Sequence, residues 1–322
     1  MKNAKLFLLL FALSVSLCAP ALANQGVTEV SAGYLKGLKL SPEELAPLVL
    51  IIPGSGPTDR EGNTHMGESK IYHLLAQALY DAYRLASVRV DKRGMFSSGA
   101  PGVDPNAVSM QDYADDARLW VNSLKQESTD GCIWLFGNSE GGLVALLAAQ
   151  EPEGICGVVL AAAPGRKMGE ILREQLQNNP SNAPIIIQVF ETVGELEAGR
   201  KVDVTRLAPP LQQLFYPAVQ NFMIDKMRYD PAELIAEISL PVLILQGESD
   251  LQISPERDAE RLHKAAPGSR LVLLPGITHV FKKAASDSLQ DNYAIYTDPK
   301  ARVHESVVKA IGDFIVASIP KP

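Results

Sequence analysis

Residues 133–142 place an apolar run directly before a Gly-x-Ser-x-Gly pattern, in the order Ile-Trp-Leu-Phe-Gly-Asn-Ser-Glu-Gly-Gly. This order predicts a strand that turns sharply at Ser139 and passes into a helix beginning at about Glu140. Only small residues fit beside such a turn, and Gly137 and Gly141 supply them. The turn would hold the serine hydroxyl clear of the sheet, within reach of a base and an acyl carbonyl. A serine between two glycines is often only a turn, so the strand before it and the helix after it carry the prediction.

Apolar runs alternate with helical patterns along the chain, which is typical of an α/β protein with a parallel sheet covered by helices on both faces. An apolar stripe at i, i+3 and i+4 predicts a helix over 71–82, and further helices are expected at 111–125 and 302–317. The predicted strands are 48–52, 88–90, 132–136, 155–160, 242–245 and 271–274.

The segment 164–240 interrupts this alternation. It contains no good strand pattern, and prolines separate its helical patterns at 167–177, 185–196 and 211–227. A segment inserted between two strands of a parallel sheet lies above the carboxyl edge of that sheet, so we expect a helical cap over the site. The domains would then be a core of residues 24–163 and 241–322, with the cap at 164–240. The alternative is a peripheral group of helices that touches no functional residue.

A serine nucleophile needs a histidine base that a carboxylate orients. His279 is the predicted base because it follows the strand pattern 271–274 and the turn Pro275-Gly276, which places it on a loop beyond a strand end. His65, in a loop near the first predicted strand, is its only rival. The remaining histidines are expected to be solvated or structural: His73, His263 and His304.

The orienting carboxylate should also follow a strand. The sequence after 242–245 offers Glu248 and Asp250. Asp250 is the better choice, because a Gly-x-x-Asp turn leaves room for a short side chain to point back at an imidazole. Glu248 is expected to be solvated.

An oxyanion needs hydrogen-bond donors, and backbone N–H groups at a helix start supply them. The N–H of Glu140 is one predicted donor. The other comes from the glycine-rich loop 53–57 after the first predicted strand, where Ser55 is in the right position. Such a loop could also bind phosphate, but it lacks the Lys-Ser/Thr pair of a P-loop.

Several motifs together resemble an exported bacterial branch of the α/β-hydrolase superfamily, of the carboxylesterase-like or serine-aminopeptidase-like kind. They are Pro-Gly-Ser-Gly-Pro-Thr-Asp-Arg-Glu-Gly-Asn at 53–63, Val-Asp-Lys-Arg-Gly at 90–94, the turn at Ser139, Tyr-Asp-Pro at 229–231 and Pro-Val-Leu-Ile-Leu-Gln-Gly at 241–247. The similarity covers nearly all of 47–317. The order nucleophile, acid, base is also that of α/β-hydrolases. The resemblance implies a serine hydrolase with an α/β-hydrolase fold, catalytic Ser139, Asp250 and His279, and oxyanion donors Ser55 and Glu140.

Two segments depart from the pattern of this superfamily. Residues 24–46 are short for the antiparallel strands that usually open the fold, so we expect that edge of the sheet to be reduced. Met95-Phe96-Ser97-Ser98 replaces a more usual Gly-x-Gly-x-Ser-like ending of its loop, which is expected to alter one wall of the pocket.

Residues 1–23 have the features of a secretory signal peptide: two early lysines, an apolar run too short to span a membrane, and Ala21-Leu22-Ala23 as a cleavage site. Cys18 suggests lipidation as an alternative, but Leu17 stands where a small residue is needed. Cleavage after Ala23 would leave a periplasmic or secreted protein and change the net charge from −7 to −9 by removing two lysines. An acidic chain without a basic run favours neither nucleic-acid binding nor attraction to anionic lipid. No other long apolar stretch follows residue 23, so stable membrane insertion is not expected after cleavage.

Cys132 and Cys156 would remain after cleavage. In an oxidising compartment this pair predicts a disulfide, because both residues lie at the amino ends of predicted neighbouring strands. Two buried reduced thiols are the alternative.

The leading functional hypothesis is hydrolysis of a small carboxylic ester, which requires no metal or organic cofactor. An amidase or aminopeptidase is the alternative; it would need an acidic anchor for a free amine, for which Glu170, Glu174 and Glu191 are available. A third hypothesis is a non-catalytic ligand-binding pseudo-hydrolase. Apolar residues of the predicted cap could line an acyl pocket or form the cap's own core: Phe190, Phe215, Phe222 and Met223.

Overall fold

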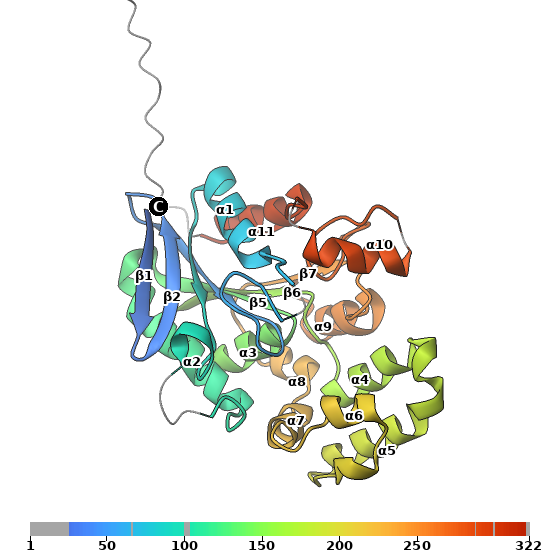
Figure 1. The fold of residues 1–322 in the computed structure, drawn as a ribbon. Coiled ribbons are helices and arrows are strands. Elements are labelled where there is room, and N and C mark those ends of the chain that lie inside the picture. Colours follow the sequence, from blue (N-terminus) through green and yellow to red (C-terminus); the bar gives the residue numbers. More distant parts are fainter. Residues whose placement is uncertain (1–25, 66, 100–103, 287, 299, 320–322) are drawn as a thin grey trace, which may run out of the picture.

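The computed structural model describes residues 26–65, 67–99, 104–286, 288–298 and 300–319, so the predicted signal peptide and Cys18 lie outside the described residues. Its centre is an eight-stranded sheet in the order β1-β2-β4-β3-β5-β6-β7-β8 (Figure 1). The strands from β4 to β8 in this order are parallel, which confirms the mostly parallel sheet. The strands are β1 Gly26–Ala32, β2 Leu35–Ser41, β3 Ala46–Ile52, β4 Ala86–Val90, β5 Ser128–Asn138, β6 Ile155–Ala161, β7 Val242–Gly247 and β8 Arg270–Leu274.

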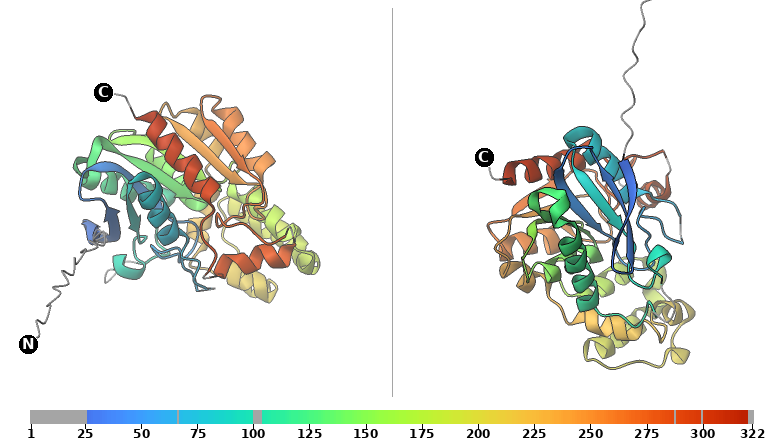
Figure 2. Two further views of the ribbon diagram at one scale, coloured as in Figure 1. Left: turned by 90° about the horizontal axis from the view of Figure 1, so that it is seen from above. Right: turned by 90° about the vertical axis from the view of Figure 1, so that its left-hand side faces the viewer.

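The expectation of a reduced first edge is wrong. Strands β1 and β2 form a complete antiparallel hairpin, and β2 also pairs with β4 (Figure 2, right). The short segment suffices because only Gly33 and Tyr34 connect the two strands, and Gly33 adopts the left-handed conformation that a two-residue turn requires.

Two hydrophobic cores cover the two faces of the sheet, because successive residues of a strand point to opposite faces. In β3, Leu48, Leu50 and Ile52 belong to one core, while Val49 and Ile51 belong to the other. Helices α2 Met110–Leu124, α3 Glu140–Ala148, α8 Pro231–Ala236 and α9 Glu260–Ala265 cover the first face. Helices α1 Ile71–Tyr83 and α11 Glu305–Ser318 cover the second, as Figure 2 (left) illustrates for α11.

Residues 164–240, all of which the structure describes, form helices and no strand between β6 and β7. Four of these helices gather at one side of the molecule (Figure 1): α4 Met168–Gln177, α5 Ile186–Glu197, α6 Pro209–Leu214 and α7 Gln220–Met227. We call residues 164–240 the helical insertion. It has a small hydrophobic core of its own, which includes Val189, Val193 and Phe215.

The single helix expected over 211–227 is wrong, since the chain forms α6 and α7 with a break between them. Pro217 lies in the break, and a proline in a helix interior removes a backbone hydrogen bond and clashes with the preceding turn. The remaining short elements were not predicted. They are α10 Leu289–Ala294, 3₁₀ segments at Phe96–Ser98, Lys125–Glu127, Pro180–Ile185, Val204–Arg206 and Ile295–Thr297, and a π-helical turn at Pro255–Ala259.

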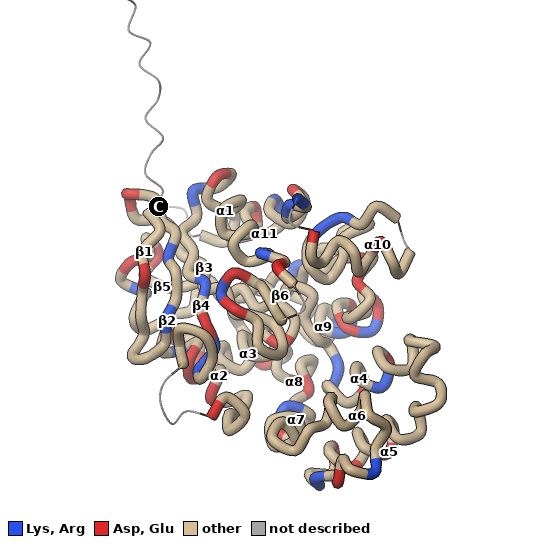
Figure 3. The backbone as a smooth tube through the Cα atoms, in the orientation of Figure 1, with Lys and Arg blue, Asp and Glu red and all other residues tan. Residues whose placement is uncertain are grey.

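The neighbouring parallel strands β5 and β6 carry the two cysteines. Cys132 and Cys156 form a disulfide with their Cα atoms 5.2 Å apart. The described part of the chain contains no helix with the length and apolar composition needed to cross a membrane. Figure 3 shows positions of both charge signs distributed over the described chain.

Candidate active site

Ser139 occupies the sharp turn between β5 and α3. Its backbone has φ 52° and ψ −121°, a strained conformation for a residue with a side chain. The glycines of the pattern are required by close packing: a Cβ on Gly137 would lie 2.3 Å from the carbonyl oxygen of Gly141, and one on Gly141 would lie 2.4 Å from that of Ile52. Ser139 itself is only partly buried. The turn therefore has the conformation that the sequence predicted for a nucleophile.

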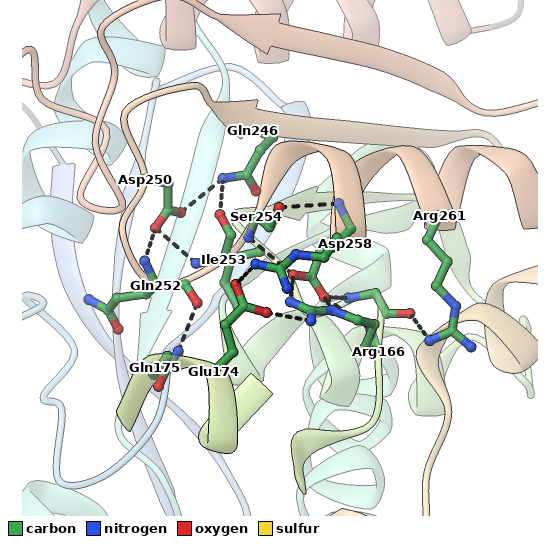
Figure 4. A network of polar contacts seen from close by, with 12 residues as sticks. Arg166, Glu174, Gln175, Gln246, Asp250, Gln252, Ile253, Ser254, Asp258 and Arg261 are labelled. Carbon is green, nitrogen blue, oxygen red and sulfur yellow. Dashed lines mark hydrogen bonds and ion pairs between the residues drawn. The ribbon is translucent and has the colours of Figure 1, made fainter. Parts of the chain in front are cut away.

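Asp250 and His279 form a hydrogen-bonded pair beyond the carboxyl ends of β7 and β8. The Nδ1 atom of His279 lies 2.8 Å from Oδ2 of Asp250, and both residues are buried. The other Asp250 oxygen accepts hydrogen bonds from the backbone N–H groups of Gln252 at 2.7 Å and Ile253 at 3.1 Å (Figure 4). These contacts hold the carboxylate so that it can orient the imidazole ring.

Gln246 supports the same carboxylate, a role that was not predicted from the sequence. Its Nε2 donates to Oδ2 of Asp250 at 2.9 Å and to the carbonyl oxygen of Ile253 at 3.1 Å (Figure 4). It also lies within hydrogen-bonding distance of the carbonyl oxygen of Gly247. The residue is fully enclosed at the end of β7. A polar side chain at the end of an apolar strand is the only signal of this role in the sequence.

The rival residues lie elsewhere. Glu248 is exposed, and so is His65. The other three histidines have local partners: His73 contacts Glu61 and Arg89, His263 contacts Ser269, and His304 caps the start of α11.

The loop after β3 packs against the Ser139 turn. A Cβ on Gly54 would lie 3.4 Å from the Cβ of Ser139. The N–H of Gly54 donates to Oη of Tyr72 at 2.8 Å, and this hydroxyl donates to Oδ1 of Asn138 at 2.9 Å. Because the Gly54 N–H already donates to Tyr72, the next N–H along the loop that could serve an oxyanion is that of Ser55. Burial raises the pKa of Tyr72, so its hydroxyl stays protonated as a donor. No pattern in the sequence indicates this contact between Tyr72, Gly54 and Asn138.

Two of the motifs that resemble the α/β-hydrolase superfamily, at 53–63 and 90–94, lie in the same region. Within 53–63, Asp59 closes the loop on itself by accepting from the N–H groups of Glu61 at 2.9 Å and Asn63 at 2.8 Å. Arg60 then joins this loop to the one after β4 through an ion pair with Asp91, with 3.0 Å between Nε and Oδ2.

Glu140 is the first residue of α3, and its side-chain carboxylate is buried. Because the first N–H groups of a helix have no intrahelical acceptor, its N–H is available to a ligand. Its carboxylate lies 3.0 Å from Nζ of Lys92 and 2.7 Å from Nζ of Lys226 on α7. Burial opposes ionisation, but the ammonium groups of Lys226 and Lys92 outweigh it and hold the pKa of Glu140 at about 2. The hydroxyl of Ser55 also donates to this carboxylate, at 3.2 Å.

A cavity of about 280 Å³ lies beside the Ser55 loop and extends to the helical insertion. Ser55, Glu140 and the two lysines line it together with Phe222 and Met223, two of the four apolar residues named for the acyl pocket. Phe215 is instead enclosed in the core of the insertion, and Phe190 is partly exposed beside Arg173. Met95 also lines the cavity, so the unusual segment at 95–98 does contribute to its wall.

The five predicted site residues thus lie on loops or turns at the carboxyl ends of β3, β5, β7 and β8, which meet at one edge of the sheet. The structure brings Asp250 to His279 and Ser55 to Glu140, in each case by a side-chain hydrogen bond. In the described ranges, no group of three or more His, Cys, Asp and Glu side chains is arranged to hold a metal ion.

Known proteins resemble this chain in sequence and in fold. Esterase EstD of Thermotoga maritima is 24% identical over 274 residues; the match covers 84% of this chain and 62% of EstD, so the chain spans less than two thirds of that relative. The structure of Est1E from Butyrivibrio proteoclasticus matches with a TM-score of 0.56 at 17% identity, over 92% of this chain and all of the other. A proline iminopeptidase-related protein from Thermus thermophilus matches with a TM-score of 0.57 at 17% identity, over 91% of this chain and 98% of the other.

Both structural matches agree with the fold described above. The family model for the alpha/beta hydrolase family matches residues 49–281, which is most of the chain and includes all five predicted site residues. The chain therefore belongs to the alpha/beta hydrolase family.

Proposed function

We propose that the protein is a serine hydrolase that cleaves small carboxylic esters through an acyl-enzyme intermediate. The observation that carries the proposal is the strained Ser139 turn at the same sheet edge as the buried Asp250–His279 pair. The sequence similarity to an esterase supports ester chemistry.

In the proposed reaction, Ser139 Oγ attacks the ester carbonyl while His279 accepts the hydroxyl proton through Nε2. Asp250 holds the other ring nitrogen and stabilises the imidazolium that forms. The N–H groups of Ser55 and Glu140 stabilise the negative oxygen of the tetrahedral intermediate. His279 then returns the proton to the departing alcohol, and a water molecule, deprotonated by the same base, releases the acyl group as a carboxylic acid. The cycle regenerates the enzyme with no net change in charge on its residues.

The environment of the site favours esters over aminopeptidase substrates. A free amine needs an anionic anchor, but Glu170 and Glu191 are exposed, and Glu174 is paired with Arg166 and Arg257. The cavity beside the Ser55 loop has two lysines in its wall, and these would repel a protonated amine.

The helical insertion is proposed to act as the cap of this site. Its residue Lys226 reaches the buried carboxylate of Glu140, and its residues Phe222 and Met223 line the cavity. We also propose that the protein is exported, because the features of residues 1–23 and the Cys132–Cys156 disulfide both fit an oxidising compartment.

A substrate panel tests the proposed activity. The wild-type protein should hydrolyse short p-nitrophenyl esters much faster than aminoacyl-p-nitroanilides, and a fluorophosphonate probe should label Ser139. Ser139→Ala and His279→Ala should each lower kcat by several orders of magnitude with the fold intact, because the triad acts as a unit. Circular dichroism provides the folding control. Full turnover by Ser139→Ala would contradict the proposal, and ligand binding without turnover or labelling in the wild type would favour a pseudo-hydrolase.

A further inference from the structure

The cavity beside the Ser55 loop combines an apolar wall with a charged floor. Most of the wall comes from the helical insertion and the segment before α2, and it includes Val108, Leu214, Val219 and Phe222. The floor consists of Lys92, Lys226 and Glu140, of which each is more than nine-tenths buried. An apolar cavity with a charged floor suits a ligand that carries a charged group on a short carbon chain.

The floor has an excess of one positive charge. Two ammonium groups face the single carboxylate of Glu140, and no other acidic residue lines the cavity among the residues that the structure describes. None of the nearby acidic residues Asp91, Asp112 and Asp116 lines the cavity: Asp91 pairs with Arg60, and Asp112 and Asp116 share the one guanidinium of Arg93. Because a buried charge is costly when it is not compensated, this floor favours an anionic ligand.

Both ammonium groups also have donor capacity to spare. A lysine has three N–H donors. The ammonium of Lys226 donates to Glu140 and, at 3.4 Å, to Oγ of Ser55. The ammonium of Lys92 donates to Glu140 and, at 3.1 Å, to the carbonyl oxygen of Gly56. Within the described part of the chain, these acceptors account for two of the three donors of each lysine, and the Lys92 ammonium also lies 5.4 Å from the centre of the Tyr113 ring. Each lysine therefore has one N–H left for a ligand in the cavity that both side chains line.

The sheet order indicates which part of an ester would occupy this cavity. Ser139 follows the central strand β5, and His279 follows β8 at one edge of the sheet. Within the lining of the cavity, Ser55, Gly56 and Pro57 follow β3 and Lys92 follows β4, on the other side of β5. Glu140 begins α3 directly after β5, and Lys226 reaches it from α7 of the insertion. Since His279 must protonate the departing alcohol, that alcohol belongs on the β8 side. The acyl part then belongs on the side of β3 and β4, at the lysines.

We infer that the cavity selects esters whose acyl part carries a second, ionised carboxylate, that is, half-esters of short dicarboxylic acids. The inference rests on the proposed function and specifies its substrate class. The free carboxylate of the substrate accepts a hydrogen bond from Lys226 and from Lys92, and it neutralises the excess charge of the floor. Such charge-assisted hydrogen bonds are about twice as strong as neutral ones.

A matched pair of substrates isolates this charge. Monoethyl succinate and ethyl levulinate have the same ester and almost the same shape, but the first ends in a carboxylate and the second in a neutral acetyl group. Near neutral pH, the wild type should show a kcat/KM about 10-fold or more higher for the anionic ester, a difference that corresponds to about 1.4 kcal/mol. The ratio of the two values cancels any general loss of activity or of folded protein.

Three variants test the role of charge in the floor: one removes a positive charge, one keeps it and one removes the negative charge. Lys226→Met removes one positive charge and should lower the ratio about 10-fold, whereas Lys226→Arg keeps the charge and should retain most of the preference. Glu140→Gln removes the negative charge and should raise the ratio. If Lys226→Met is too unstable to assay, Lys92→Met provides the same test, because Lys92 belongs to the core of the protein and not to the insertion.

The outcomes separate this inference from the proposed function. Suppose that the wild type hydrolyses p-nitrophenyl acetate. If it then prefers ethyl levulinate, or cleaves neither ethyl ester, the inference is overturned and the proposed hydrolase function stands. An unchanged ratio in both Lys226→Met and Lys92→Met also overturns it. Failure of the wild type to cleave any ester overturns the proposed function itself.

Discussion

At the scale of single residues, Glu140 has two roles that are set by different parts of the structure. Its backbone N–H is placed by the start of α3, whereas its side chain is placed by two lysines from distant segments. A carboxylate next to an oxyanion donor would oppose the negative charge of a tetrahedral intermediate. Lys92 and Lys226 remove this opposition by compensating the carboxylate.

This buried cluster predicts a pH dependence of stability. Because the folded-state pKa of Glu140 is about 2, below its ordinary value of 4.5, the carboxylate contributes stability that is fully present above about pH 5. The contribution is lost as the pH falls through 4.5 toward 2. Between these limits the stability advantage of the wild type over Glu140→Gln should shrink by about 3 kcal/mol. Urea unfolding at a series of pH values measures it, and a constant difference would contradict the assigned charge state.

The choice between the two acids after β7 makes a second prediction. Asp250→Asn should lower kcat by about 10⁴-fold, because an amide no longer holds the required tautomer of His279. Glu248→Gln should have little effect, since that side chain is exposed. Esterase kinetics on both variants provide the comparison, and equal small effects would place the orienting carboxylate elsewhere.

At the scale of elements, neighbouring parallel strands position the site and are themselves cross-linked. β5 ends at the Ser139 turn, while the disulfide joins the amino-terminal halves of β5 and β6, away from that turn. The cross-link is therefore expected to stabilise the sheet without a direct effect on catalysis.

Removal of the disulfide tests this separation. The cysteines are 24 residues apart in sequence, so a Cys132→Ser/Cys156→Ser variant should lose roughly 3 kcal/mol of stability in the chain-entropy model. Its kcat at low temperature should stay close to that of the wild type. Non-reducing mass spectrometry of the exported protein checks the bond, and two alkylatable thiols on the unfolded, unreduced chain would exclude it.

At the scale of the whole molecule, the helical insertion is fastened to the core at several points. Near its start, the buried Asp258 accepts hydrogen bonds from the N–H groups of Gly165 and Arg166 at 3.0 and 3.1 Å and pairs with the Arg166 guanidinium (Figure 4). Gln175 on α4 donates to the carbonyl oxygen of Gln252, whose own N–H holds Asp250. Lys226 fastens the other end of the insertion to Glu140. These contacts connect the position of the insertion to both halves of the site.

The first anchor can be broken selectively. Asp258→Asn removes the charge that Arg166 faces, and loss of one partner of a buried ion pair costs about 3 kcal/mol or more. Hydrogen exchange in α4 should become faster than exchange in α1, on the far side of the sheet. Glu170→Gln on the exposed face of α4 is the matched control and should leave exchange unchanged. Equal acceleration in both helices would indicate global destabilisation instead of a loosened insertion.

Much of this architecture could be predicted from local patterns. The six core strands, the turn at Ser139, and the helices on both faces follow from apolar periodicity and glycine placement, because these depend on residues close together in sequence. The β1–β2 hairpin could not be predicted in the same way, because both strands are short and contain many polar residues among their apolar ones. Pro217 is a local signal of a helix break, but the helical pattern on both sides of it predicted one continuous helix over 211–227.

The sequence by itself determined the order of Ser139, Asp250 and His279 and the sheet edge at which each one lies, because a parallel sheet brings the carboxyl ends of its strands together. Only the tertiary structure decided how these residues are supported. Tyr72 and Lys226 have no local signal of their roles; Tyr72 lies 66 residues from Asn138, and Lys226 lies 86 residues from Glu140. Their partners depend on how helices pack on the sheet and on where the insertion folds back. Polar pairing over such separations is a property of the packed molecule, and no periodicity along the chain records it.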